Sequence, residues 1–341
     1  MAGGKESSAT ESASDGARGP ASARGATVSD IFLSRLGDLE KRVERELGRP
    51  LPGGGPAAAF VGDLAREAWR AGASLLDSAA TAAGRGGILA SWTAGDPVDE
   101  LGFDAGLSES VREIVRPLAR RWLGLREHRS AALPERGGVL ILLNRSAWPL
   151  PVEAMVLGSF LCDGRLGDRR LATLWDEDLP ELPWVSDFLR RIGVVAASED
   201  NARALLERGA VVVAFPEGRA AHAKTYDRRY RLTRFDGKGL VAAALEAGAR
   251  IVPGAVVGSE ESYALVGRVA GFPVTPQFPL LGPLGLLPLP VHWTLRLGAP
   301  VEYTTMEADV ASVDAVADAV RARMQALLGE LLSQRDSIFG G

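Results

Sequence analysis

The chain has 341 residues, of which 46% are hydrophobic and 24% are charged, and its formal net charge is −4. These values are typical of a globular protein with one large domain and an accessory part. A slightly acidic balance and the absence of a recognition motif argue against nucleic acid as a partner. A single cysteine, Cys162, excludes an internal disulfide, and we expect no zinc or other metal site.

The N-terminal part differs in composition from the rest. Residues 1–27 are rich in Gly, Ala and Ser, which predicts a disordered tail without the apolar core of a signal peptide. Residues 28–95 are expected to be helical, with a Pro/Gly-rich linker at 50–56. Apolar residues spaced three or four apart predict an amphipathic helix over 29–47, which offers a surface for self-association. No stretch reaches the ~18–20 apolar residues of a membrane span.

A second amphipathic helix is predicted from Ser108 to Leu123. It carries apolar residues on one side and four arginines, at positions 112, 116, 120 and 121, on the other. Such a basic face can lie on an anionic membrane, or it can be a solvated face of a helix that packs on a core.

From residue 125 strands and helices alternate, which predicts an α/β fold with a mixed, mainly parallel sheet flanked by helices. We place this domain at 96–310 and a C-terminal helix and tail at 311–341. Strands are expected at 138–143, 170–174, 194–195, 211–214, 251–257 and 293–297, the fifth interrupted by Pro253. Helices are expected at 152–161, 184–192, 200–208, 240–247 and 312–332.

The strand at 211–214 is apolar on both faces and ends in Phe215-Pro216-Glu217-Gly218-Arg219. A run of this kind suits the middle of a parallel sheet covered by helices on both sides. Ligands of such sheets bind just beyond the carboxyl ends of the strands, where Glu217 and Arg219 are expected to lie. The alternative is a surface turn closed by a salt bridge.

Three segments follow one another in a recognisable order: Asn144-Arg145-Ser146 with Glu153 downstream, Phe215–Arg219, and Ile251–Val257 with Pro253 inside. In this order the chain resembles the phospholipid/glycerol acyltransferase family, which includes the lysophosphatidate acyltransferases. That family carries an Asn-His block with a downstream acid, a Phe-Pro-Glu-Gly block with a nearby Arg, and a late Val-Pro block. The resemblance covers residues 96–302.

The resemblance implies acyl transfer from acyl-CoA or acyl carrier protein to the hydroxyl of a lysophospholipid or related glycerolipid. It implies no bound cofactor, and a peripheral location on the cytoplasmic face of the inner membrane. In the family a histidine, oriented by an acid, deprotonates the hydroxyl that attacks the thioester. Glu217, Gly218 and Arg219 match the block that holds the acceptor's phosphate side. Because a guanidinium binds phosphate and a carboxylate does not, we expect Glu217 to orient Arg219 or a hydroxyl.

The sequence departs from the family at the catalytic block. Arg145 stands where the family has histidine, and a guanidinium is always protonated and has no acceptor lone pair. Glu153 can stand in for the acid with one residue of slack. Three accounts are open: a lost activity with Arg145 as an anion clamp beside Arg219, a surrogate base, or weak catalysis through positioning alone. His222 is the candidate surrogate, and its alternative is an exposed loop histidine.

Two further segments carry a functional and a structural interpretation. Residues 226–234 hold four arginines, among them Arg228 and Arg229, which suit phosphates of CoA or of lipid headgroups or form a solvated loop. The proline-rich apolar segment 272–291 suits the wall of an acyl-chain groove, a membrane-dipping surface or a buried irregular crossing. Trp293 beyond it is a candidate for a membrane interface.

Overall fold

The structure is a computed structural model. It describes residues 98–146, 151–163, 166, 169–175, 183–233, 235–263, 267–269, 272–274, 288–303 and 309–335. The predicted tail at 1–27, the helical region at 28–95 and the self-association helix at 29–47 lie outside these residues. Most of the proline-rich segment 272–291 lies outside them as well.

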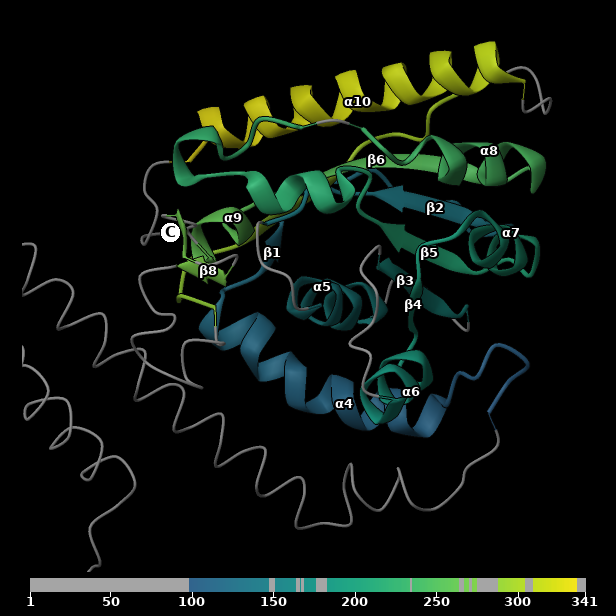
Figure 1. The fold of residues 1–341 in the computed structure, drawn as a ribbon, viewed down its shortest axis with the longest axis horizontal. Coiled ribbons are helices and arrows are strands. Elements are labelled where there is room, and N and C mark those ends of the chain that lie inside the picture. The colour runs from purple at the N-terminus through teal and green to yellow at the C-terminus, as the bar shows by residue number, and fades with distance from the viewer. Residues whose placement is uncertain are drawn as a thin grey trace, which may run out of the picture. The chain divides into compact units, whose positions relative to one another are not determined.

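A seven-stranded sheet in the order β1-β9-β6-β2-β5-β3-β4 forms the centre of the described domain (Figure 1). The strands are β1 (Arg126–Glu127), β2 (Val139–Leu142), β3 (Leu171–Trp175), β4 (Val194–Ala196), β5 (Val211–Ala214), β6 (Arg250–Val257) and β9 (Thr294–Leu297). All neighbours pair in parallel except β6 and β9, which are antiparallel. The mixed, mainly parallel sheet predicted from the sequence is therefore confirmed. β7 (Gly267–Val269) and β8 (Phe272–Val274) form a separate antiparallel pair.

Helices cover both faces of this sheet (Figure 1). One layer contains α7 (Glu199–Glu207), α8 (Lys238–Glu246) and α10 (Val310–Ser333), and the other contains α4 (Ala105–Pro117), α5 (Val152–Cys162) and α6 (Pro183–Arg191). A π-helical turn, η1 (Leu118–Trp122), extends α4, and short elements η2 (Gly218–Ala223), η3 (Tyr226–Arg228) and α9 (Ser259–Ser262) follow β5 and β6. Leu140, Val212 and Leu174 pack toward the first layer in one hydrophobic core with Val320 and Met324 of α10. Successive residues of a strand point to opposite faces of the sheet, so the strand residues next to these three point toward the second layer.

β5 lies between β2 and β3 and is completely buried along its length. This position explains its apolar run, because a central strand with helices on both sides has no solvated face. Ala214 at its end is in register with Leu142 of β2 and Leu174 of β3, and Leu142 is in register with Pro253. The carboxyl ends of these strands therefore open onto one edge of the sheet.

The predicted interruption of β6 at Pro253 is wrong, because the strand runs without a break from Arg250 to Val257. The carbonyl of Pro253 accepts a hydrogen bond of 2.8 Å from the backbone of Gly298, which lies just past the end of β9. Antiparallel pairing with β9 covers Gly254 to Val257 only. The missing N–H of proline thus falls where the ladder has already ended, and the strand tolerates it.

Three of the four arginines on the basic side of α4 and η1 form ion pairs within the domain. Arg112 and Arg116 pair with Glu109 of the same helix, and Arg116 and Arg120 pair with Asp163 after α5 at 3.1 and 2.6 Å. These contacts agree with the packed-helix interpretation of this segment.

Cys162 and Trp293 both lie inside the domain. Cys162 lines a cavity of about 40 Å³ between α4, α5, β3 and β4, with its Sγ 3.4 Å from Nη1 of Arg112. Burial raises the pKa of its thiol above 9.0, which disfavours a reactive thiolate. Trp293 is completely buried, and its Nε1 donates to Oγ of Ser262 at 2.7 Å, so the expectation of a membrane-interface tryptophan is wrong.

Candidate functional site

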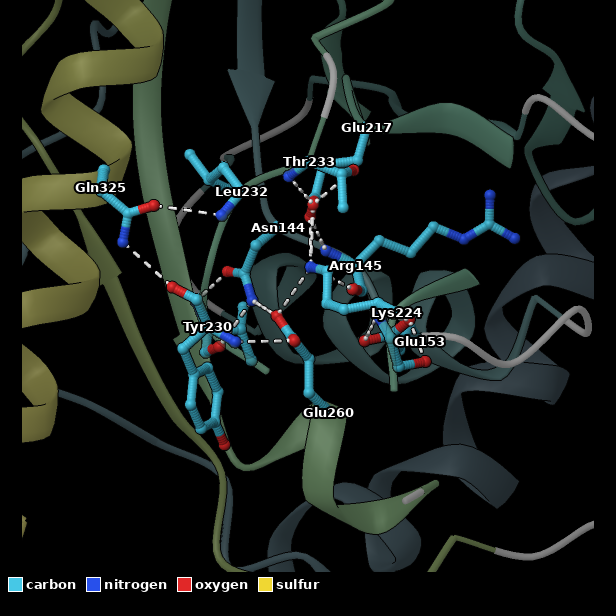
Figure 2. Close-up of polar contacts among 12 residues, drawn as sticks. Asn144, Arg145, Glu153, Glu217, Lys224, Tyr230, Leu232, Thr233, Glu260 and Gln325 are labelled. Carbon is cyan, nitrogen blue, oxygen red and sulfur yellow. Dashed lines mark hydrogen bonds and ion pairs between the residues drawn. The ribbon is translucent and has the colours of Figure 1, made fainter. Parts of the chain in front are cut away.

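Polar side chains from three strand ends meet at the carboxyl edge of the sheet (Figure 2). Asn144 and Arg145 follow β2, Glu217 follows β5, and Glu260 lies in α9, directly after β6. All four are buried, with at most 5% of each residue exposed. Such buried polar groups need partners within the protein, and their contacts define the site.

Asn144 joins the end of β2 to β6. Its Oδ1 accepts the backbone N–H of Val256 at 2.7 Å, and its Nδ2 donates to the carbonyl of the same residue at 2.9 Å. The side-chain amide thus replaces a strand neighbour at this point. Nδ2 also donates to Oε1 of Glu260 at 2.9 Å, which ties the side chain to α9.

Arg145 is completely buried at the position where the sequence comparison places a catalytic histidine. Its guanidinium carbon lies 3.8 Å from the ring centroid of Trp175, at the end of β3, which is a close cation–π contact. Phe215 meets the same indole edge-on at 5.6 Å. The guanidinium Nη2 lies 2.9 Å from Nε2 of His222, which belongs to η2. The structure therefore brings Arg145 and His222 together.

The contact with Arg145 decides the proton arrangement on His222. A guanidinium only donates hydrogen bonds, so Nε2 of His222 accepts and the imidazole proton resides on Nδ1. The lone pair that a general base needs is consequently engaged by Arg145.

Glu153, the candidate acid, is bound to Ser146. One carboxylate oxygen accepts the backbone N–H of Ser146 at 3.1 Å, and the other accepts that N–H at 3.0 Å and the Oγ–H at 2.8 Å. Burial raises the pKa of Glu153 above 4.5, while the Ser146 hydrogen bonds and the charge of Arg145 oppose that rise. The acid and the residue in the histidine position thus have different partners.

Glu217 organises the chain around the site. Its Oε1 accepts the backbone N–H of Arg145 at 3.1 Å, and its Oε2 accepts the N–H and Oγ–H of Thr233 at 2.8 and 3.0 Å. Lys224 adds an ion pair of 2.8 Å. These contacts hold the backbone segments of Arg145 and Thr233 together. From the sequence we expected Glu217 to orient Arg219 or a hydroxyl, and that expectation did not include this structural role.

The two residues after Glu217 differ in exposure. Gly218 is buried at a φ of 54°, which a residue with a Cβ adopts only under strain. Arg219 is exposed at the start of η2. The glycine therefore makes the turn that carries Arg219 to the surface.

Lys224 and Glu260 are site residues that the sequence interpretation missed. The Nζ of Lys224 lies 2.9 Å from Oε1 of Glu217, 3.2 Å from Oε1 of Glu260 and 3.3 Å from the carbonyl of Arg145. Burial lowers the pKa of Lys224, but the two carboxylates more than offset this and raise it above 10.5. Burial raises the pKa of Glu260 to about 7, with Lys224 opposing and Glu217 adding to the rise. The sequence offered one signal for Glu260, namely that the pair Glu260-Glu261 closely follows a strand that is apolar enough to be buried.

The arginine-rich segment borders this site. Arg228 is exposed, whereas Arg229 is half-buried, with its guanidinium 4.1 Å from the ring of Tyr226 and its Nε 3.5 Å from Glu261. Glu261 also pairs with Arg335, just after α10, at 2.6 Å. The charge of Arg229 is thus partly balanced within the protein, while Arg228 faces solvent.

Comparison with known proteins agrees with these motifs. A family profile described as "Acyltransferase" matches residues 124–257, which include all three motif segments. An uncharacterized protein of Mycobacterium leprae is 37% identical over 274 residues, covering 75% of this chain and 73% of its own. An uncharacterized protein of Mycobacterium tuberculosis is 35% identical over 280 residues, or 78% of each chain. The chain belongs to the phospholipid/glycerol acyltransferase family.

A solved structure is also similar to this acyltransferase-family chain. It is the 1-acyl-sn-glycerophosphate (LPA) acyltransferase PlsC from Thermotoga maritima, with a TM-score of 0.44 and 15% identity. The match covers 67% of this chain and 84% of that one.

None of the described helices is long and apolar enough to cross a membrane. Within the same part of the chain, no group of three or more His, Cys, Asp or Glu side chains is arranged to hold a metal ion.

Proposed function

We propose that this protein binds an acyl donor and a lysophospholipid or related glycerolipid at the carboxyl edge of its sheet, without the proton transfer of the family's histidine–acid pair. The acyl donor is acyl-CoA or acyl carrier protein, and no cofactor is bound. The observation that supports this proposal is the environment of Arg145. A buried guanidinium stacked on Trp175 occupies the histidine position and donates to His222.

The proton chemistry of these groups supports the proposed absence of proton transfer. Acyl transfer to a hydroxyl needs a group that accepts its proton near neutral pH. The guanidinium of Arg145 has no lone pair for this role, and the lone pair of His222 on Nε2 already accepts from Arg145. Glu153 is buried and directed to Ser146. None of the three groups is arranged to take a proton from an acceptor hydroxyl.

Cationic side chains at the same edge support ligand binding. Arg145 at the end of β2 and Arg219 after β5 belong to neighbouring strands, and Arg228 and Arg229 follow within ten residues. Guanidinium groups bind phosphate through two parallel hydrogen bonds, and both CoA and lysophosphatidate carry phosphate. We assign the acceptor phosphate to Arg145, Gly218 and Arg219, and the outer phosphates to Arg228 and Arg229.

A second candidate function is acyl transfer with His222 as base. Its support is the 2.9 Å separation between Nε2 of His222 and Nη2 of Arg145. A ligand phosphate that accepts from Arg145 releases this lone pair. His222 then takes the hydroxyl proton, the oxygen bonds to the thioester carbonyl carbon, the C–S bond breaks, and the thiolate leaves with the proton.

The two candidates differ in one measurement. Purified full-length protein is mixed with radiolabelled acyl-CoA, or with labelled acyl carrier protein, and lysophosphatidate, with heat-denatured protein as control. Isothermal titration calorimetry measures the binding of each ligand separately. The binding proposal expects measurable affinity, weakened at least tenfold by Arg145→Ala, and transfer at the level of the control. Transfer well above that control that His222→Gln abolishes would establish the second candidate instead.

We also propose peripheral contact with the cytoplasmic face of the inner membrane through the segment that carries Tyr226 and Arg228. Tyr226 is 37% exposed and lies beside exposed basic residues, a combination that suits an anionic lipid surface. Sedimentation with phosphatidylglycerol vesicles tests this contact against neutral phosphatidylcholine vesicles. We expect binding to the anionic vesicles only, with loss in high salt and in the Tyr226→Ala, Arg228→Ala double variant. Equal binding to both vesicle types would contradict the proposal.

A further inference from the structure

Three ionisable side chains of the site form a buried cluster (Figure 2). Lys224 is 4% exposed, Glu260 is 5% exposed and Glu217 is completely buried. The ammonium group of Lys224 lies within 3.2 Å of both carboxylates. Two potential negative charges therefore share one positive charge in a place that water does not reach.

The carboxylates of this cluster hold the segment that follows Lys224. Glu260 Oε2 accepts the backbone N–H of Tyr230 at 2.8 Å, and Glu217 Oε2 accepts that of Thr233 at the same distance. Between them, Gln325 of α10 accepts the N–H of Leu232 at 3.0 Å and donates to the carbonyl of Tyr230 at 3.0 Å. Tyr230 has a φ of 61°, an uncommon conformation for a bulky residue. The segment thus needs these contacts to keep its shape.

We propose that Lys224 and Glu260 are positioning residues of the ligand site, and that a proton held in the Glu217–Lys224–Glu260 cluster keeps the segment 224–233 closed. This segment carries Arg228 and Arg229, so the inference rests on the ligand-binding function proposed above. The ammonium group of Lys224 also donates to the main-chain carbonyl of Arg145 at 3.3 Å, which holds that backbone in place. The cluster therefore sets the relative positions of both cationic parts of the site.

A count of charges gives the direction of the effect. With one carboxyl protonated, the cluster is neutral, whereas with both ionised it carries an unbalanced buried negative charge. Among the residues that the structure describes, Lys224 is the one cation that pairs with Glu260. The Tyr230 hydroxyl accepts the N–H of Gly258, and Arg229 and Arg335 pair with Glu261 on the same helix. Consistently, burial raises the pKa of Glu260 to about 7, against the opposing effect of Lys224.

Loss of the proton is expected to open the segment, because opening lets water solvate the carboxylate. The equilibrium between closed and open forms then shifts toward the open form by up to about tenfold for each pH unit above 7. Below pH 7 the cluster is neutral and the segment stays closed. Glu260→Gln removes the charge that titrates and keeps one acceptor oxygen, so the opening of this variant is expected to be independent of pH across this range.

Hydrogen–deuterium exchange with mass spectrometry tests this in the full chain without any ligand. Exchange of peptides that contain residues 230–233 is measured from pH 6 to 8.5 and corrected for the intrinsic pH dependence. The wild type should lose protection by about fivefold between pH 7 and 8, because one group with a pKa of about 7 approaches tenfold per pH unit only above that range. Glu260→Gln should show no such loss. Glu261→Gln is the matched control, since it changes a neighbouring buried carboxyl and should keep the wild-type dependence.

A second variant distinguishes the loss of the charge from a folding defect in Glu260→Gln. Glu217→Gln also leaves one carboxylate for Lys224, and it should flatten the pH dependence in the same way. Equal pH dependence in the wild type and in both variants would overturn the proposal, as would a flat wild-type profile.

A binding arm separates this inference from the proposed function. The affinity for lysophosphatidate is compared between the wild type and Glu260→Gln at each pH, so that titration of the ligand cancels. The ratio should favour the variant increasingly above pH 7. A pH-dependent exchange without any ligand binding would refute the proposed function and leave only the proton-dependent closure of residues 224–233 intact.

Discussion

Replacing Arg145 by histidine puts a base back at the family position, yet we expect little acyl transfer from that variant alone. The reason is Ser146, which binds both oxygens of Glu153 through its N–H and one of them through its Oγ–H at 2.8 Å. A histidine acts well as a base only when an acid fixes its tautomer and orientation. In Arg145→His that acid remains bound to the neighbouring residue.

Removing the Ser146 hydroxyl should loosen the hold on the acid, which then keeps its bonds from the Ser146 N–H. A hydrogen bond to a charged group contributes about 1.5–3 kcal/mol, which corresponds to a population change of about 10- to 150-fold. The double variant Arg145→His, Ser146→Ala should therefore transfer acyl groups about 10- to 150-fold faster than Arg145→His. The assay is the transfer of labelled acyl groups from acyl-CoA to lysophosphatidate, measured at equal amounts of folded protein.

Ser146→Ala in the Arg145 background is the control, and it should remain inactive because it loosens the hold on the acid without supplying a base. If the single and double histidine variants differ by less than twofold, Ser146 does not restrain Glu153. If the Ser146→Ala control is active, the guanidinium at position 145 is not what blocks transfer.

Three further predictions concern the stability of the fold. Asn144→Ala removes the partner of both backbone groups of Val256 and should lower the free energy of unfolding by about 2–3 kcal/mol in a denaturant titration; a change below about 0.5 kcal/mol would contradict the role assigned to the amide. Asp104→Asn breaks a buried ion pair of 2.6 Å with Arg191, between α4 and α6, and should cost about 3–5 kcal/mol while the exchange profile of residues 230–233 keeps its pH dependence. The third uses the carboxyl of Glu260, whose pKa is raised by burial from its ordinary 4.5 to about 7 in the fold. Because the folded state binds its proton more tightly, the free energy of unfolding should fall by on the order of 3 kcal/mol as the pH rises from 4 to 8, and Glu260→Gln should remove this part of the slope.

The sequence predicted the framework of this domain well because its strands and helices have strong local signals. Val211–Ala214 is apolar at every position, and such a run in a chain of alternating strands and helices indicates a central parallel strand. Ser198 accepts the N–H of Asn201 and caps α7 as its residue type suggests. Pro253 misled the prediction because its effect depends on where the neighbouring strand ends, and no local pattern contains that information.

The site was predicted less completely because its parts meet only in three dimensions. The sequence pointed to Arg145, Glu153 and His222 as site residues, but it did not predict which of them interact. In the structure the guanidinium of Arg145 lies near His222, and Glu153 binds Ser146. Lys224 reads locally as one more basic loop residue. Its burial follows from the two carboxylates that reach it from β5 and α9. The burial of such a lysine can be predicted only when the register of the strands is known, because the register brings the two carboxylates to it.

The way Arg145 is attached explains how this position tolerates a change of side chain. Its main-chain N–H donates to Glu217 and its carbonyl accepts from Lys224, so the cluster holds the backbone and not the guanidinium. Those contacts are available to any residue other than proline at this position. A side chain that cannot act as a base can therefore stand at this position without disturbing the three strand ends that shape the site. The same main-chain contacts would hold the backbone of a histidine at position 145 in place. Acyl transfer by that variant therefore depends mainly on whether Glu153 is free to orient the histidine.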